Sequence, residues 1–173
     1  MISKDYIQYI RNIPFNDSPI KEPQDVWSWY VIPIFNSYAK FQKDMTHPHV
    51  LDRYETREAL GWIATLTISS MWMLVAVTGK DIETLKQELI ELHERKNAGY
   101  SGNDNDPWKN FRMCEKFGIP AYVGCITRLC DKVSRFETVY NNSSLDKVNE
   151  SAIDTLYDMV AYCGILYHLV KEL

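Results

Sequence analysis

Apolar residues along this chain recur every three to four positions, the spacing that places them on one face of an α-helix. No run of alternating apolar and polar residues is joined by an Asn-Gly or Asp-Gly turn, the usual signal of a β-hairpin. The pattern therefore predicts an all-α protein, built as a helical bundle.

Prolines, glycines and capping residues mark the expected helix ends. Gly79 is a favoured residue just after a helix, Asp81 is a good N-cap for the next one, and Pro120 suits a first turn. The helix that begins at Asp81 is expected to end near Asn97 and Gly99. The expected helices cover residues 5–13, a segment from residue 25 that Pro33 kinks or divides, 52–78, 82–97, 107–118, 120–140 and 150–171.

The chain divides into two predicted parts. Residues 1–50 contain one short helix, the Pro-rich connection NIPFNDSPIKEP and the aromatic segment after it, which we interpret as an N-terminal helical extension. Residues 51–173 hold the remaining helices and form the predicted bundle. The candidate chemistry lies in this second part.

Charge and composition exclude several classes of function. The net charge of -4 and the pI near 5.6 do not favour a protein that works by general attraction to nucleic-acid backbones, so no direct nucleic-acid binding is expected. The start of the chain, MISKDYIQYIRNI, lacks the uninterrupted apolar segment of a secretory signal. We therefore expect a cytoplasmic protein.

Cysteine and histidine do not form a metal-binding pattern. No two cysteines have the two-residue separation of a metal or redox motif, and His47 and His49 flank Pro48 in a predicted loop. Free, mostly buried thiols are therefore expected. The four cysteines are Cys114, Cys125, Cys130 and Cys163.

One segment has the length and composition of a membrane span. Residues 59–79 carry no charged side chain and are long enough to cross a hydrocarbon core. Five Ser and Thr residues and the absence of clustered Lys or Arg on either side favour a buried central helix instead. The expectation is a core helix and no membrane partner.

Three acidic residues stack on the last predicted helix. Glu150, Asp154 and Asp158 recur every four residues, and the helix after them has no charge from Met159 to Val170. Carboxylates that lead into a buried helix need a partner, for which a divalent cation is suitable. The alternative is an acidic face in water, stabilised at its start by the helix dipole.

A second acidic set lies in the sequence QELIELHER. Glu88, Glu91 and Glu94 repeat at three-residue steps and border a stripe of leucines. Two helices that each present paired carboxylates suit Mg²⁺ or Mn²⁺ bound to substrate phosphates. The alternative is a solvated face in which Arg95 pairs with Glu91.

The third candidate set is cationic. Arg128, Lys132 and Arg135 fall on one face of the helix that contains TRLCDKVSRF, and Lys96 continues the leucine stripe of another helix. These side chains suit phosphate oxygens across a cleft or from a second subunit. A face opposite the core is also commonly a solvated one, so that interpretation stays open.

The order of three sequence blocks resembles a known family. RKNAGYSGNDNDPWKNFR, GCITRLCDKVSRF and ESAIDTLYDMVAYCGIL are similar to the nucleotide-modification-associated helical proteins of bacteriophage genomes, which in turn resemble MazG-like all-α nucleoside triphosphate pyrophosphatases. This resemblance covers about the C-terminal half. It implies a bundle that forms a homodimer or higher homo-oligomer and handles (d)NTPs with Mg²⁺.

Two acidic pairs follow from the resemblance. Glu88 with Glu91 matches the first pair of the pyrophosphatases, although Glu91 with Glu94 is also possible. Asp154 with Asp158 matches the second pair, but its DxxxD spacing departs from the usual ExxD. The four carboxylates Glu88, Glu91, Asp154 and Asp158 are the expected ligands of Mg²⁺ (or Mn²⁺).

The function predicted from these sets is Mg-dependent pyrophosphohydrolysis of a (d)NTP or a modified nucleotide. Glu91, Asp154 and Asp158 are the expected catalytic residues, and Tyr100 or Trp108 is a candidate to stack on the base. The expected substrate-binding residues are Lys96, Tyr100, Arg128, Lys132 and Arg135. The alternatives are a non-catalytic phage protein that sequesters a nucleotide or cyclic nucleotide, and a purely structural bundle.

Overall fold

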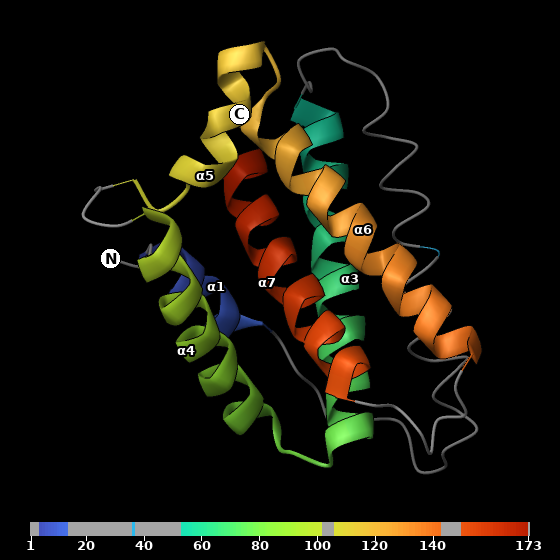
Figure 1. Cartoon of the computed structure of the whole chain (residues 1–173). Coiled ribbons are helices and arrows are strands. Elements are labelled where there is room, and N and C mark those ends of the chain that lie inside the picture. The colour runs from blue at the N-terminus through green and yellow to red at the C-terminus, as the bar shows by residue number, and fades with distance from the viewer. Residues whose placement is uncertain (1–3, 14–35, 37–52, 102–105, 143–149, 173) are drawn as a thin grey trace.

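Helices account for the regular structure of the described residues (Figure 1). The structure is a computed structural model that describes residues 4–13, 36, 53–101, 106–142 and 150–172. No strand occurs among these residues, and the predicted all-α fold is confirmed. The elements are α1 (Lys4–Asn12), α3 (Arg53–Thr78), α4 (Ile82–Ser101), α5 (Lys109–Arg112), the 3-10 turn η2 (Met113–Phe117), α6 (Ala121–Asn142) and α7 (Glu150–Lys171).

Helix α7 is the central element of the bundle. It contacts α1, α3, α4 and α6, and in Figure 1 it runs between the other long helices. Its uncharged stretch is buried on nearly every side, as expected for a helix that is apolar all round. The fully buried residues of α7 are Leu156, Met159, Val160, Cys163, Leu166 and Val170.

Helix α3 makes the largest contact with α7. Its buried face includes Ile63, Leu66 and Leu74, and the hydroxyl of Thr67 donates to the Ile63 carbonyl at 2.7 Å. That bond satisfies a buried polar group within the helix. By length and composition, the stretch Arg57–Thr78 within α3 is long and apolar enough to cross a membrane. One face of the helix packs on α7, but only 44% of its most apolar window is buried, so the core-helix interpretation and the absence of a membrane partner both stay predictions.

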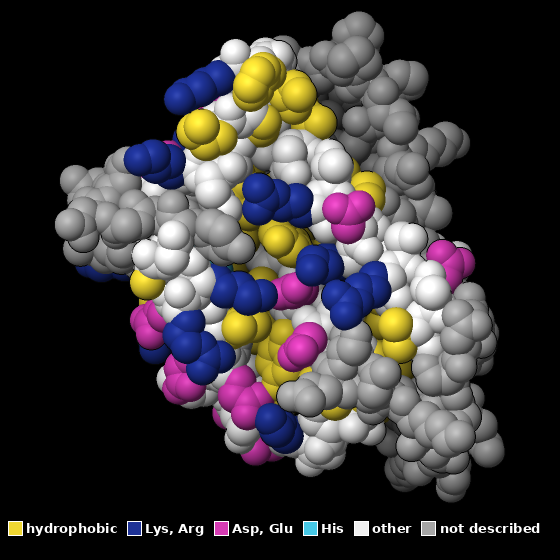
Figure 2. Space-filling model, viewed as in Figure 1, with side chains coloured by type: hydrophobic (Ala, Val, Ile, Leu, Met, Phe, Trp, Pro, Cys, Tyr) yellow, Lys and Arg dark blue, Asp and Glu magenta, His cyan; other side chains and the backbone are white. Residues whose placement is uncertain are grey.

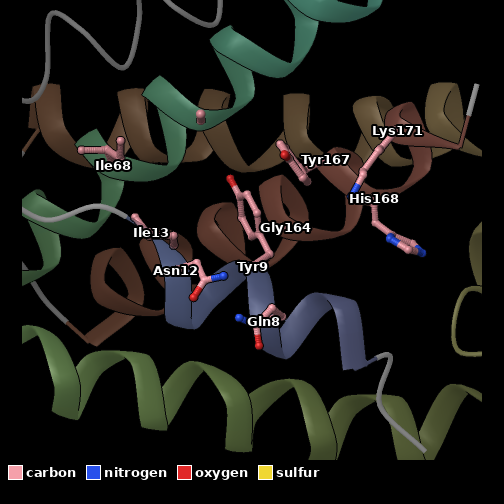
Figure 3. A pocket seen from close by; sticks show the side chains of 10 residues that line it. Gln8, Tyr9, Asn12, Ile13, Ile68, Gly164, Tyr167, His168 and Lys171 are labelled. Carbon is pink, nitrogen blue, oxygen red and sulfur yellow. The ribbon is translucent and has the colours of Figure 1, made fainter.

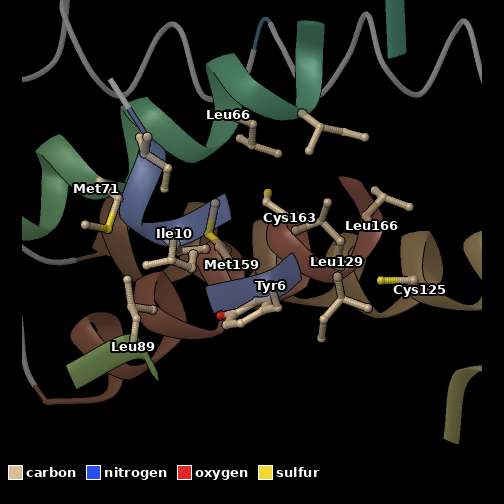
Figure 4. Packing of buried hydrophobic residues seen from close by; sticks show 14 of the residues in the cluster. Tyr6, Ile10, Leu66, Met71, Leu89, Cys125, Leu129, Met159, Cys163 and Leu166 are labelled. Atoms are coloured by element: carbon tan, nitrogen blue, oxygen red, sulfur yellow. The ribbon is translucent and has the colours of Figure 1, made fainter. Parts of the chain in front are cut away.

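Helix α1 packs closely on α4 and α7. Tyr6 and Ile10 are fully buried in the common core (Figure 4). The close contact between α1 and α7 depends on Gly164 of α7. A Cβ atom at that position would lie only 2.6 Å from Cε2 of Tyr6. The first helix of the predicted extension is therefore part of the bundle core.

Most of the predicted helix ends are found in the structure. Thr84 donates its backbone N–H to Asp81 Oδ1 at 2.9 Å, which confirms the predicted N-cap of α4. Gly79 and Gly118 have φ of 68° and 74°, the left-handed conformation that follows a helix. Residues 25–35, including Pro33, and the pair His47 and His49 lie outside the described residues.

One helix end differs from the prediction. Helix α4 continues past Asn97 and Gly99 to Ser101. Asn97 is only 6% exposed and lies on the buried side of the helix, one turn after His93. This packing outweighs the cost of about 1 kcal/mol for a glycine in a helix.

Candidate functional site

Two lysines, one from α4 and one from α6, hold one aspartate of α7. Lys132 of α6 lies 2.8 Å from Asp158 Oδ2, and Lys96 of α4 bonds to Asp158 Oδ1. Asp158 itself belongs to α7, and its side chain is only 17% exposed. We call this arrangement the lysine–aspartate bridge. Figure 2 shows Lys, Arg, Asp and Glu side chains gathered on this face of the molecule.

The bridge keeps the aspartate charged. Burial alone raises the pKa of Asp158, but the hydrogen bonds and charges of Lys132 and Lys96 outweigh it, and the net effect lowers the pKa. Each lysine uses one of its three N–H donors on the carboxylate. The ammonium groups therefore converge on one point and keep donors for another acceptor.

Arg128 adds a third cation to this group. Together with Lys96 and Asp158, Arg128 lines a small cavity of about 50 Å³. The Arg128 guanidinium lies over the ring of Phe111, 5.1 Å from its centroid, in a cation–π contact. Arg128 thus adds a positive charge beside the bridge, whereas Asp158 itself bonds to Lys96 and Lys132.

The other two predicted substrate-binding residues are less defined. Arg135 is exposed on α6, one turn after Lys132. Tyr100 lies in the last turn of α4, and its side chain is outside the described residues. Trp108, the other candidate to stack on a base, is 2% exposed and lies 5.7 Å from the His93 ring centroid. Trp108 therefore serves the core and is closed to a ligand in this arrangement.

Three of the four predicted metal ligands line a separate, more open cleft. Glu88, Glu91 and Asp154 surround a volume of about 340 Å³ together with Lys80, Arg95 and Tyr157. Glu88 Oε1 accepts from Lys80 Nζ at 2.6 Å, and Glu88 Oε2 accepts from the Tyr157 hydroxyl. Glu94 is exposed elsewhere on α4.

Three of the four carboxylates that a metal would need already have hydrogen-bond partners. Both oxygens of Glu88 and both oxygens of Asp158 already have partners, and Glu91 accepts from Gln87 at 2.9 Å. Among the described residues, no three His, Cys, Asp or Glu side chains stand close enough to hold a metal ion. The described arrangement does not fit an Mg²⁺ ion held by all four carboxylates unless the existing ion pairs open.

His93 is a residue of the site that the sequence did not single out. It is 6% exposed, stacks on Tyr6 with 4.0 Å between ring centroids, and lines the same cavity as Lys96 and Arg128. Its Nε2 atom is buried and has no hydrogen-bond partner among the described residues. Burial, and to a lesser extent the charge of Lys96, lowers the pKa of His93 to about 4. The available signal was its position three residues before Lys96.

A third hollow lies between α1, α3 and α7 (Figure 3). Its volume is about 330 Å³, and Tyr9 stacks on Tyr167 at its wall with 4.4 Å between ring centroids. The Tyr9 hydroxyl is 2.8 Å from the hydroxyl of Thr67. This hollow contains none of the residues predicted to bind metal or substrate.

Comparisons with known proteins add no relative. No protein-family model, curated protein or solved structure matches the chain. The resemblance to phage nucleotide-modification-associated and MazG-like proteins therefore stays a prediction. The site has to be interpreted from its own geometry.

Proposed function

We propose that this protein binds a phosphorylated small molecule, with a nucleotide as the leading class, on Lys96, Arg128 and Lys132. The observation that carries the proposal is the lysine–aspartate bridge, in which ammonium groups from α4 and α6 meet at one carboxylate. This is the non-catalytic binding function predicted as the alternative from sequence.

The bridge suits a phosphate because it positions two cations before a ligand arrives. Lys96 and Lys132 are otherwise long, flexible side chains, and holding them at Asp158 reduces the entropy lost on binding. Their remaining N–H groups and the guanidinium of Arg128 are donors for phosphate oxygens. Asp158 therefore acts as a positioning residue and need not leave its lysines.

The carboxylates support binding better than hydrolysis. Glu88 and Asp158 are held by Lys80, Tyr157, Lys96 and Lys132, so two of the four expected metal ligands are engaged. Protein cations already neutralise them, which removes the need for a metal partner that the sequence suggested.

The test is isothermal titration calorimetry without metal, using ATP, dATP, inorganic triphosphate and adenosine. The phosphorylated compounds are expected to bind and adenosine is not. Lys132→Ala removes one charge-assisted contact of about 1.5–3 kcal/mol, which weakens binding by about ten- to a hundredfold. The matched control is Lys116→Ala, because Lys116 is an exposed lysine of η2 outside the group.

The dependence of affinity on salt concentration is a second test of the same contacts. Affinity should fall as ionic strength rises, and the dependence should be weaker for Lys132→Ala than for Lys116→Ala. Equal loss of affinity in both variants, or binding of adenosine as tight as that of ATP, would refute the proposal.

Metal-dependent pyrophosphohydrolysis is the second candidate. The observation in its favour is that Glu88, Glu91 and Asp154 line one cleft that adjoins Asp158 on α7. Its test is release of pyrophosphate from a panel of NTPs, dNTPs and modified nucleotides with Mg²⁺ or Mn²⁺. Hydrolysis should be lost in Asp154→Asn, whereas a sequestering protein should bind stoichiometrically, release no pyrophosphate and depend more on Lys132.

The sequence and its resemblance support further proposals. We infer a cytoplasmic protein of the MazG-like class that assembles as a homodimer or a higher homo-oligomer and has no membrane or nucleic-acid partner. Multi-angle light scattering of the purified chain tests the assembly. Extraction without detergent tests the location, and recovery only with the membrane fraction would contradict it.

A further inference from the structure

The cavity beside the lysine–aspartate bridge has a feature that phosphate binding leaves unexplained. His93 lines it, and His93 Nε2 is buried without a hydrogen-bond partner among the described residues. An unsatisfied buried polar atom is costly, and native proteins contain few of them. A group that enters the cavity and bonds to this nitrogen would recover that cost.

We propose that the cavity receives a sugar hydroxyl of the phosphorylated ligand, with His93 Nε2 as its hydrogen-bond partner. The inference rests on the proposed function and specifies its ligand class. The site would then favour nucleotides that carry the hydroxyl over deoxy analogues that lack it.

The positions of the residues suit a nucleotide that spans phosphate and sugar. His93 and Lys96 both belong to α4 and are separated by one turn, so their Cβ atoms are about 5–6 Å apart. Lys96 also lines the cavity and bonds to Asp158 at its edge. A ligand with its phosphate on Lys96 would therefore place the adjoining sugar near His93.

The size of the cavity limits what enters it. Its volume is about 50 Å³, several times the roughly 10–15 Å³ that one water needs by the same measure, so a hydroxyl and the carbon that carries it have room there. Phe111 and Tyr162 also line the cavity and meet edge to face, which gives an apolar wall for the carbon atoms of the sugar.

A hydroxyl is the chemical group that matches a neutral histidine. Burial keeps His93 uncharged at neutral pH, so one ring nitrogen carries a proton and the other is an acceptor. A hydroxyl donates or accepts, and it therefore pairs with Nε2 in either tautomer. A phosphate oxygen only accepts, so it matches Nε2 only in the tautomer in which that nitrogen carries the proton.

The test compares ATP with its 2′-deoxy and 3′-deoxy analogues by calorimetry on the full chain. We expect wild type to bind ATP about tenfold more tightly than at least one deoxy analogue, the effect of one hydrogen bond to a buried group. His93→Phe keeps a ring to stack on Tyr6 but removes the nitrogen, so the preference should fall to about one. Melting temperature and circular dichroism confirm that the variant is folded.

Two further variants separate this inference from the proposed function. Lys132→Ala should weaken ATP and both analogues equally and leave the preference intact. His168→Phe is the matched control for loss of a histidine, since His168 lies 5.4 Å from the Trp108 ring and outside this cavity, and it should leave the preference intact.

The outcomes are distinct. If ATP and both analogues bind with equal affinity to wild type, or if His93→Phe retains the preference, the inference is refuted and phosphate binding stands. If no phosphorylated compound binds, the proposed function fails, and the inference fails with it.

Discussion

Removing the His93 imidazole should change how the stability of the protein depends on pH. The pKa of His93 in the folded protein is about 4, against 6.5 for an ordinary histidine, because burial disfavours its charged form. Between these two values the unfolded chain binds a proton that the folded chain does not. The free energy of unfolding therefore falls as the pH decreases from 6.5 towards 4.

The size of the change in unfolding free energy follows from the shift in the pKa of His93. Between about pH 8 and about pH 4.5, proton binding to the unfolded state lowers the stability by about 2.5 kcal/mol. For a chain of this size that corresponds to a decrease of about 5–10 °C in melting temperature. The lowered pKa values of Asp158 and Glu88 act in the same direction but at lower pH, since their unfolded values are 3.8 and 4.5. Above about pH 4.5 the effect of these carboxylates is therefore smaller than that of His93.

The assay is urea unfolding at a series of pH values, followed by circular dichroism, for wild type, His93→Phe and His168→Phe. His93→Phe should lose most of the pH dependence between about pH 6.5 and about pH 4.5, while His168→Phe should keep it. The same slope in His93→Phe and wild type would refute the burial argument for His93. A slope lost in both histidine variants would show that the effect is not specific to His93.

Three substitutions test the packing. Gly164→Ala should destabilise the protein by about 1–3 kcal/mol, because its Cβ would collide with the Tyr6 ring, and chemical denaturation would detect this; unchanged stability would contradict the close packing of α1 on α7. Leu89→Ala, at a fully buried position of α4, should cost about 2–5 kcal/mol in the same measurement, and a cost below that range would mean that α4 is loosely packed. Gly118→Ala should lower the free energy of unfolding by about 1–2 kcal/mol, because a φ of 74° is strained for alanine even though the space around this position is open. A neutral result would argue against the left-handed turn after η2.

The fold followed from local signals that act within a few residues. Asp81 caps α4, Gly79 ends α3, and Gly118 ends η2, each as the sequence predicted. Such caps depend on the chemistry of one turn, so they can be recognised without knowing the rest of the structure. The end of α4 differed because burial of Asn97 depends on neighbouring helices, which the sequence does not display.

The candidate site was only partly predictable for the same reason. The charges of Lys96, Lys132 and Asp158 were visible in the sequence, but their meeting depends on how α4, α6 and α7 pack. The spacing of the acids suggested a metal, whereas the structure supplies lysines as partners of Asp158. His93 was overlooked because its stacking partner Tyr6 lies on α1, far away in the chain.

The central position of α7 has a consequence for synthesis of the protein. α7 follows α1, α3, α4 and α6 in the chain, yet all four pack against it. Roughly 90 residues separate the end of α3 from the end of α7. At a synthesis rate of about 5–20 residues per second, the apolar face of α3 is therefore made roughly 5–20 s before α7 is complete. During that interval the ribosome-bound chain exposes an apolar surface to water. We therefore expect the yield of folded protein in a cell to depend on chaperones that bind nascent helices.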